Sequence, residues 1–269
     1  MEEAFALSST PDLEARSPWA LQNVDKVSIT KTQSTLKNEI DLPGSKSLTN
    51  RALILAAVAS GESTVKGILK SDDSYWCIEA LKKLGADIEV KGDTAYIKGV
   101  GGKWKKRDEA LYIGAGGTVA RFLPGLVATA KTEDQWLIRA SKRMSERPVK
   151  PLIDALKQLG ATIEYGEKEG FYPLEISGKG LKGGSVAISG NTSSQFISGL
   201  LMASPYAENP VTVNITEPIV QASYVLITTE LMKQFGVEVT YNEDLTTFEI
   251  TPDNYKGTEV TMEPDASGA

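Results

Sequence analysis

The chain has 269 residues, a formal net charge of −6 and 41% hydrophobic residues, a composition typical of a soluble globular protein with one large domain or two smaller ones. The acidic balance argues against nucleic acid as the main partner, so an anionic ligand would have to meet cations concentrated locally in a cleft. Histidine is absent and Cys77 is the only cysteine, which excludes an internal disulfide, His-based catalysis and metal sites built from histidine or paired cysteines.

The first 25 residues are polar and contain proline and serine without a sustained hydrophobic period, which predicts a mobile leader. They lack the basic and then apolar pattern of a signal peptide, and no apolar run reaches transmembrane length. We therefore expect a cytoplasmic protein that makes no membrane contact. Residues 27–30 and 39–42 are predicted to form two short strands joined by a polar turn.

An internal repeat follows. The segments LKKLGADIEV, LKQLGATIEY and MKQFGVEVTY occupy residues 81–90, 156–165 and 232–241. Their glycines, Gly85, Gly160 and Gly236, are separated by 75 and 76 residues. Three copies at nearly constant spacing predict three equivalent supersecondary units.

Each unit contains the same elements in the same order. A helix that is apolar on almost every side is predicted at 48–59, 119–130 and 195–204, and such a helix is normally buried. A short strand follows at 63–68, 135–140 and 211–215. Amphipathic helices are predicted at 72–84, 148–159 and 222–235, each ended by a glycine. Two alternating strands close each unit, at 87–90 and 95–98, 162–165 and 174–177, and 238–241 and 248–251. The βαβαββ pattern, repeated three times, predicts an α/β domain with helices inside and sheets outside.

The three apolar helices begin with residues that suit an anion: PGSKSLTNR at 43–51, GAGGTVAR at 114–121 and SGNTSSQF at 189–196. Glycines let a ligand approach the backbone, serine hydroxyls donate hydrogen bonds, and lysine and arginine add charge. Cations at a helix start oppose the helix dipole, and a bound anion would offset that cost. The alternative for the first helix is a buried helix with two solvated basic residues. Three such starts in phase predict one shared anion pocket.

Two standard phosphate motifs are absent. Residues 44–46 do not supply the Walker loop, and the segment that begins at Gly114 has Val119 where the dinucleotide fingerprint needs glycine. Neither ATP nor NAD is favoured as a ligand.

The segment SKRMSERP at 141–148 carries three cations and Glu146, and it is either a binding loop or an exposed loop with a local ion pair.

LPGSKSLTNRALILAA at 42–57, the glycine turn that ends at Arg121, RMSERP at 143–148 and NTSSQFISGLLMASPYA at 191–207 together resemble the 5-enolpyruvylshikimate-3-phosphate (EPSP) synthases. The resemblance runs from about residue 27 to the end. It implies the inside-out α/β barrel of the enolpyruvyl transferases, in which two domains of three βαβαββ units close on two anionic substrates. The implied reaction transfers enolpyruvyl from phosphoenolpyruvate to the 5-hydroxyl of shikimate 3-phosphate, in the shikimate pathway to chorismate and aromatic amino acids. It needs no metal or organic cofactor.

The resemblance also implies roles for residues around shikimate 3-phosphate. Lys46 would touch both substrates, while Ser47 and Arg51 would hold the shikimate part. Ser193 and Ser194 would take the phosphate.

Further residues follow from the same motifs. Gln195 would lie between the two ligands, and Tyr224 would lie beside the shikimate phosphate. Gly117 and Arg143 would bind phosphoenolpyruvate, with Arg121 either supporting that loop or joining the contact.

Two positions depart from the family pattern. The glycine turn usually reads GNAGT, whereas this chain has Ala115 in place of the asparagine. The missing amide would alter affinity for phosphoenolpyruvate and for glyphosate, which competes there. Gln221 stands where the family commonly has a phosphate-binding serine.

The domain organisation implied by the resemblance is incomplete. Residues 45–263 would form one complete three-repeat substrate-binding domain, 26–44 the first strands of the other domain, and 264–269 the crossover back to it. The family's catalytic acid and base lie beyond that crossover, so no residue here is assigned proton transfer. We therefore expect the N-terminal portion of a truncated or split enzyme: a monomer that binds substrate and is inactive alone, with a complementary C-terminal fragment as its candidate partner. The alternatives are the sister transferase acting on UDP-N-acetylglucosamine and a non-catalytic anion-binding module.

Overall fold

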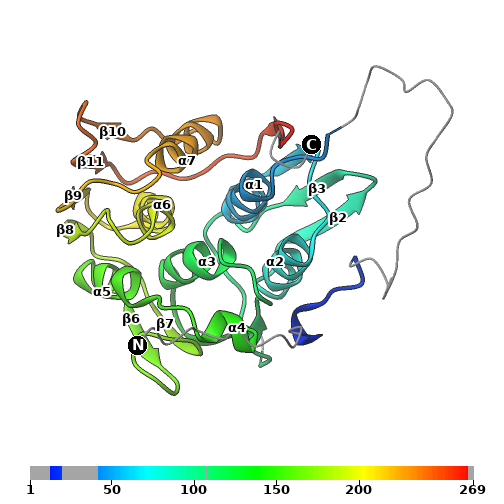
Figure 1. Ribbon diagram of the computed structural model, residues 1–269, viewed down its shortest axis with the longest axis horizontal. Coiled ribbons are helices and arrows are strands. Elements are labelled where there is room, and N and C mark those ends of the chain that lie inside the picture. The colour runs from blue at the N-terminus through cyan, green and yellow to red at the C-terminus, as the bar shows by residue number, and fades with distance from the viewer. Residues whose placement is uncertain (1–12, 20–41, 107, 266–269) are drawn as a thin grey trace, which may run out of the picture.

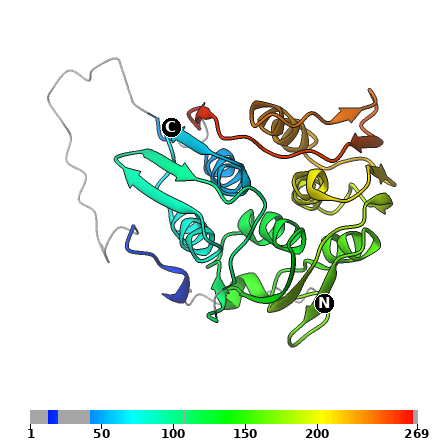
Figure 2. The ribbon, with the colours of Figure 1, turned by 180° about the vertical axis from the view of Figure 1, so that it is seen from behind.

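The computed structural model describes residues 13–19, 42–106 and 108–265. The strands predicted at 27–30 and 39–42 fall outside these ranges, except for residue 42, and so do the last four residues of the predicted crossover. The described chain forms three four-stranded sheets around a group of helices (Figure 1), and the view from behind shows the sheets on the outside as well (Figure 2). The predicted α/β architecture, with helices inside and sheets outside, is confirmed.

The elements follow the predicted order in three repeats. The first contains α1 (Lys46–Val58), β1 (Glu62–Lys66), α2 (Asp72–Lys83), β2 (Asp87–Lys91) and β3 (Thr94–Lys98). The second contains β4 (Leu111–Tyr112), α3 (Val119–Ala128), β5 (Lys131–Arg139), α4 (Lys142–Ser145), α5 (Lys150–Gln158), β6 (Thr162–Tyr165) and β7 (Leu174–Lys179). The third contains β8 (Gly184–Ile188), α6 (Ser194–Ala203), a 3-10 turn (Ser204–Tyr206), β9 (Val211–Ile215), α7 (Ser223–Gln234), β10 (Thr240–Tyr241) and β11 (Thr247–Ile250). Strand β12 (Glu259–Thr261) follows.

Strand β12 completes the first sheet from the far end of the chain. The second and third sheets each begin with a parallel pair, β4 with β5 and β8 with β9. In the first sheet the equivalent pair is β12 with β1, with Val260 opposite Val65. A bridge between Gly44 and Pro264, together with the hydrogen bond from Ser45 N to Glu263 O at 3.0 Å, brings the two ends of the domain together.

The three apolar helices α1, α3 and α6 form the centre of the molecule (Figure 1). Every residue of α3 is buried, as are residues 49–58 of α1, because neither helix has a continuous polar face. The amphipathic helices α2, α5 and α7 bury only one side each. Within the described residues, no helix combines the length and the apolar character that crossing a lipid bilayer would require.

Helix α3 contains Pro124, which has no N–H and leaves the carbonyl of Ala120, four residues earlier, without its helical partner. The hydroxyl of Tyr172 donates a hydrogen bond to this carbonyl at 2.6 Å. Burial raises the pKa of Tyr172 well above its ordinary value, so the hydroxyl stays protonated and able to donate. A side chain from the neighbouring loop thus satisfies the group that proline leaves unpaired.

Residues 13–19 lie within the leader that was predicted to be mobile, yet they contact helix α2. The indole Nε1 of Trp76 donates to the carbonyl of Ala15 at 2.8 Å, and the backbone N–H of Ser17 donates to Asp72 at 2.7 Å. The ring of Trp19 lies edge-on to that of Tyr75. Both views show this dark blue segment beside α2 (Figures 1 and 2).

Replacing Trp76 by phenylalanine tests this contact. The change keeps an aromatic ring but removes the Nε1 donor, which leaves the Ala15 carbonyl without its partner. We expect the free energy of unfolding to fall by about 1 kcal/mol, measured by urea denaturation. Tyr75→Phe, which keeps the ring that packs on Trp19, serves as the control and should change stability by less than about 0.5 kcal/mol. Equal losses in the two variants would contradict the assignment.

Candidate anion-binding site

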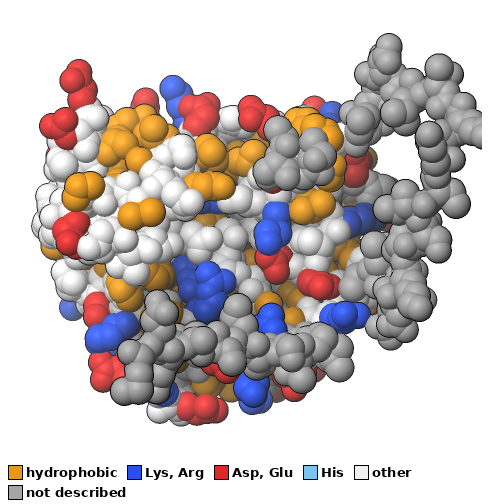
Figure 3. All heavy atoms as spheres, viewed as in Figure 1, with side chains coloured by type: hydrophobic (Ala, Val, Ile, Leu, Met, Phe, Trp, Pro, Cys, Tyr) orange, Lys and Arg blue, Asp and Glu red, His pale blue; other side chains and the backbone are white. Residues whose placement is uncertain are grey.

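The first turns of α1, α3 and α6 meet around one pocket of about 460 Å³. A cluster of Lys and Arg side chains lies near the middle of the face viewed in Figure 3. Eight of the ten predicted site residues line the pocket: Lys46, Ser47, Arg51, Gly117, Ser193, Ser194, Gln195 and Tyr224. The remaining lining residues are Asp73, Ala115, Thr118, Arg147 and Gln221. The three helix starts therefore face a shared cavity.

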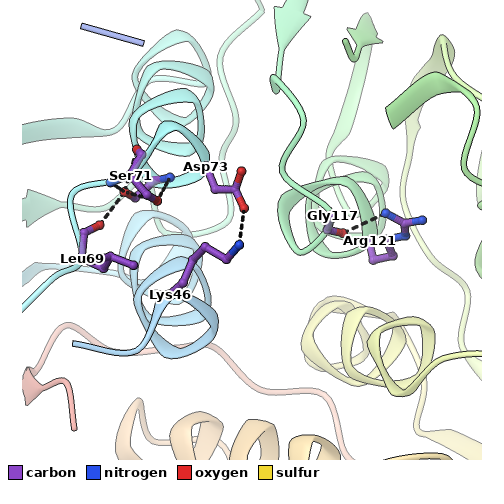
Figure 4. Close-up of polar contacts among 7 residues, drawn as sticks. Lys46, Leu69, Ser71, Asp73, Gly117 and Arg121 are labelled. Carbon is purple, nitrogen blue, oxygen red and sulfur yellow. Dashed lines mark hydrogen bonds and ion pairs between the residues drawn. The ribbon is translucent and has the colours of Figure 1, made fainter. Parts of the chain in front are cut away.

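Lys46 is the first residue of α1 and forms an ion pair with Asp73, the Nζ–Oδ2 distance being 3.3 Å (Figure 4). The Lys46 side chain is 53% exposed, whereas that of Asp73 is 16% exposed. Asp73 is the only carboxylate among the described residues that line the pocket. The structure thus neutralises Lys46 with a group that an incoming anion would have to displace.

A capping box fixes the start of α2 and with it the position of Asp73. The N–H of Ser74 donates to the Ser71 side chain, and the N–H of Ser71 donates to the Ser74 hydroxyl at 2.9 Å. The Ser74 hydroxyl also donates to the carbonyl of Leu69 at 2.6 Å (Figure 4). A carboxylate in this first turn is favoured by the helix dipole, so the position stabilises α2 as well as Lys46.

Arg51 forms the floor of the pocket one turn after Ser47, and only 1% of the residue is exposed. Its guanidinium donates to Thr228 Oγ1 at 2.8 Å, to the Ser47 carbonyl at 3.1 Å and to the Ser47 hydroxyl. It lies 4.8 Å from the centre of the Phe122 ring. Burial lowers the pKa of Arg51 to about 10, so the side chain remains a cation at neutral pH.

No carboxylate of the described residues lies within ion-pair distance of Arg51. A buried charge without a counter-ion is costly, and proteins normally pair or coordinate such charges. Hydrogen bonds to neutral oxygens offset only part of this cost. Arg51 is therefore suited to receive an anion through the pocket.

Arg121 supports the pocket from behind. Its guanidinium donates to the carbonyl of Gly117 at 3.1 Å (Figure 4). It also donates to the carbonyl of Pro148 at 3.2 Å and to the sulfur of Met144. These contacts connect the glycine turn before α3 to the segment at 141–148. Burial, followed by the nearby charge of Arg147, lowers the pKa of Arg121 to about 10. The hydrogen bonds of Arg121 to Gly117 and Pro148 are those that a support for the loop would make.

The start of α6 contributes hydroxyl groups. Ser193 is the N-cap, and its side chain accepts a hydrogen bond from the N–H of Gln195 at 3.3 Å. Ser194 begins the helix and also lines the pocket. Tyr224, at the start of α7, is 38% exposed, and its ring centre lies 5.8 Å from the Arg51 guanidinium. Gln221, which departs from the family pattern, lines the pocket with a left-handed backbone (φ 56°).

The segment at 141–148 is not the plain loop that the sequence suggested. Residues Lys142–Ser145 form the short helix α4, because the Ser141 side chain caps Met144 N–H and the Met144 side chain is buried. Arg143 is exposed on α4 and is not among the pocket-lining residues, whereas Arg147, after the helix, is. Sequence spacing identified the cations of this segment but could not show which one faces the pocket.

Two further lining residues were not predicted. Asp73 reads in the sequence as an ordinary acidic residue at a helix start, and Thr118 as part of the glycine turn.

No group of three or more His, Cys, Asp or Glu side chains that could hold a metal ion occurs in the described ranges. With three cations, one carboxylate and several hydroxyl donors, the lining can bind phosphate or carboxylate groups.

Removing the carboxylate of Asp73 should tighten anion binding. In Asp73→Asn, Lys46 loses its competing partner and the pocket loses its negative charge, so we expect inorganic phosphate to bind at least about threefold more tightly, measured by isothermal titration calorimetry. Asp72→Asn removes the same charge from the same helical turn, where Asp72 accepts from Ser17 instead. Phosphate affinity should be nearly unchanged in this control, and an equal gain in both variants would contradict the role of Asp73.

Comparisons of this chain with known proteins all point to the same family. A family model described as EPSP synthase (3-phosphoshikimate 1-carboxyvinyltransferase) matches residues 30–269. The 3-phosphoshikimate 1-carboxyvinyltransferase 2 of Halalkalibacterium halodurans is 52% identical over 259 residues, which cover 96% of this chain and 57% of that protein. The 3-phosphoshikimate 1-carboxyvinyltransferase of Actinobacillus pleuropneumoniae is 42% identical over 236 residues, 86% of this chain and 53% of the relative.

A solved structure of EPSP synthase from Acinetobacter baumannii superposes with a TM-score of 0.75 at 27% sequence identity. The match covers 85% of this chain and 50% of that one. This chain thus spans about half the length of the curated relatives and of the solved structure that it matches.

Proposed function

This chain belongs to the EPSP synthase (3-phosphoshikimate 1-carboxyvinyltransferase) family, and we propose that its pocket binds shikimate 3-phosphate beside phosphoenolpyruvate. The observation that carries the proposal is Arg51, a buried guanidinium without a carboxylate partner in the described chain, at the point where three helix starts meet. Each substrate carries a carboxylate and a phosphate, which are the groups that such a lining can hold.

Shikimate 3-phosphate would lie across the α1 and α6 starts. Arg51 and Ser47 would hold the shikimate part, and the hydroxyls of Ser193 and Ser194 would donate to its phosphate, with Tyr224 beside it. In support, these groups line one cavity, and the Arg51 guanidinium is already held by Ser47 and Thr228. A pre-positioned cation loses little conformational entropy when the anion arrives.

Phosphoenolpyruvate would lie on the α3 side of the pocket. The backbone of Gly117 and the side chain of Arg143 would bind it, Lys46 would touch both substrates, and Gln195 would lie between them. Arg143 is exposed, and it would have to turn toward the pocket when the ligand binds.

In the proposed reaction the 5-hydroxyl of shikimate 3-phosphate attacks C2 of phosphoenolpyruvate while C3 gains a proton. The hydroxyl proton is lost, and phosphate then leaves the tetrahedral intermediate as the proton added at C3 is removed, which regenerates the enolpyruvyl double bond. The residues of this chain would orient the two acids and neutralise their charge. No residue here is assigned to proton transfer.

Calorimetric titration of the chain with shikimate 3-phosphate tests the proposal. We expect one saturable site and at least about tenfold weaker binding of shikimate, which lacks the phosphate that the serines would hold. UDP-N-acetylglucosamine should not compete. Equal affinity for shikimate and its phosphate, or displacement by the nucleotide sugar, would contradict the assignment.

We also propose that the chain alone, a cytoplasmic monomer, does not turn over. Mixing it with the separately expressed second half of a close relative should restore phosphate release from the two substrates. A chain that binds anions but is never activated in this way would instead be a non-catalytic anion-binding module. Sedimentation velocity at several concentrations would test the monomeric state.

A further inference from the structure

Trp76, on α2, lies between two segments that are far apart in the chain. On one side its indole Nε1 donates to the carbonyl of Ala15, within the segment 13–19. On the other side the indole meets the bare backbone of Gly114, where a Cβ atom would lie 2.9 Å from Cγ and 3.1 Å from Nε1 of Trp76. The ring edge that donates to Ala15 is therefore the same edge that packs against Gly114.

Gly114 begins the glycine turn that leads into α3. Its backbone is left-handed (φ 60°), and its carbonyl accepts from the N–H of Ser141 at 2.9 Å. Tyr112, at the end of β4, also contacts the indole edge-on, with 4.8 Å between the ring centres. Two later residues of the turn, Ala115 and Gly117, line the anion pocket. A shift of the indole would therefore displace the backbone that faces the ligand.

The segment 13–19 is attached to α2 at further points. The N–H of Ser17 donates to Asp72, and only 7% of Ser17 is exposed. The ring of Trp19 lies edge-on to that of Tyr75, with 5.5 Å between the ring centres. These contacts hold the backbone of the segment, and with it the carbonyl that accepts from the indole, in a fixed place on the domain.

The hydrogen bond to Ala15 decides where the half-buried indole of Trp76 lies. An indole N–H needs an acceptor, so without this carbonyl the ring would turn its Nε1 toward water and away from Gly114. We propose that Trp76 is a positioning residue for the glycine turn and that the segment 13–19 acts through it on the affinity of the pocket for the second small acid. The inference rests on the proposed function, in which that acid is phosphoenolpyruvate.

Calorimetric titration of the intact 269-residue chain with phosphoenolpyruvate, alone and with saturating shikimate 3-phosphate, tests the inference. Trp76→Phe keeps a ring but removes the Nε1 donor, and we expect it to weaken phosphoenolpyruvate binding at least about fivefold. Trp19→Ala leaves the indole of Trp76 intact but loosens the segment, and it should weaken binding at least about threefold. Shikimate 3-phosphate, which would lie on the α1 and α6 side, should bind both variants within about twofold of the parent chain. A general loosening of the fold would weaken the binding of both acids.

The matched control is Trp104→Phe. The indole of Trp104 donates to the carbonyl of Leu126 at 2.7 Å, near the C-terminal end of α3, and Trp104 is not among the residues that line the anion pocket. The control thus removes the same kind of hydrogen bond from the other end of the helix that the glycine turn precedes. Its phosphoenolpyruvate affinity should stay within about twofold of the parent chain.

Hydrogen exchange at the N–H of Ser141, measured by NMR, reports on the turn without any ligand, because this N–H donates to Gly114. We expect Trp76→Phe and Trp19→Ala to speed this exchange at least about threefold more than Trp104→Phe does. Thermal unfolding of each variant checks that the fold is retained.

The outcomes separate the inference from the proposed function. Phosphoenolpyruvate affinity of Trp76→Phe within about twofold of the parent chain, or an equal loss in Trp104→Phe, overturns the positioning role. A loss in Trp76→Phe with none in Trp19→Ala overturns the role of the segment 13–19. A parent chain that never binds phosphoenolpyruvate overturns the proposed function, and the exchange at Ser141 then decides: faster exchange in Trp19→Ala than in Trp104→Phe supports the inference, and equal exchange overturns it.

Discussion

Replacing Arg51 by methionine is expected to weaken the binding of shikimate 3-phosphate by about 100-fold, which corresponds to about 2.7 kcal/mol of binding free energy. The guanidinium is the buried cation of the pocket and donates to groups on both α1 and α7. Methionine is close in length and apolar, so it fills the space without restoring the charge. Titration calorimetry gives the affinity directly.

The same substitution should leave the protein at least as stable. Replacing a buried charge that lacks a counter-ion by an apolar side chain of similar volume is often neutral or stabilising. We therefore expect a melting temperature equal to or above that of the parent chain. Lys82→Met, on the exposed side of α2, controls for the loss of one positive charge and should leave affinity unchanged. A large fall in melting temperature for Arg51→Met would show that Arg51 mainly holds the fold together.

Gly199→Ala should be strongly destabilising, because α3 and α6 touch at this residue. A Cβ atom at Gly199 would lie 2.0 Å from the carbonyl oxygen of Arg121, so the two central helices would have to separate. The greater helix propensity of alanine offsets about 1 kcal/mol of the cost. We expect a net loss of about 3 kcal/mol, which lowers the melting temperature by about 6–12 °C.

Gly125→Ala is the graded control for this contact. Its Cβ atom would meet the methyl group of Ala203 at 3.0 Å and the carbonyl oxygen of Gly199 at 3.2 Å, which a small shift can relieve. We expect it to lose about 1 kcal/mol or less. Similar melting temperatures for Gly199→Ala and the parent chain would mean that α3 and α6 are farther apart than described.

The repeated pattern in the sequence was enough to predict the architecture and most of the pocket. Residues within one helical turn, such as Ser193 and Gln195 or Ser47 and Arg51, lie together whatever the rest of the fold does. The amphipathic helices that end at Gly85, Gly160 and Gly236 recur at intervals of 75 and 76 residues. Because the repeats are equivalent, the apolar helix of each repeat begins at the same end of the domain. Local spacing and repeat phase together therefore placed seven residues around one cavity, and the family resemblance supplied the eighth, Tyr224.

What the sequence did not predict depends on contacts between distant segments. Asp73 reaches the pocket because α2 packs beside α1, and Arg147 because Arg121 binds the carbonyl of Pro148. Strand β12 has three residues and no periodicity to detect, and it forms because the chain returns to pair with β1. Residues 13–19 are held by specific hydrogen bonds and by contacts of the Trp19 ring with Tyr75 and Lys70, which no hydrophobic period reveals.

A crystal structure of this chain soaked with shikimate 3-phosphate would test most directly whether three helix starts serve one ligand. Our account predicts a single bound molecule in the 460 Å³ pocket, with its phosphate within hydrogen-bond distance of Ser193 and Ser194 and its carboxylate on Arg51. Density for the ligand outside this pocket, or a bound molecule that leaves Arg51 without an anionic partner, would contradict it.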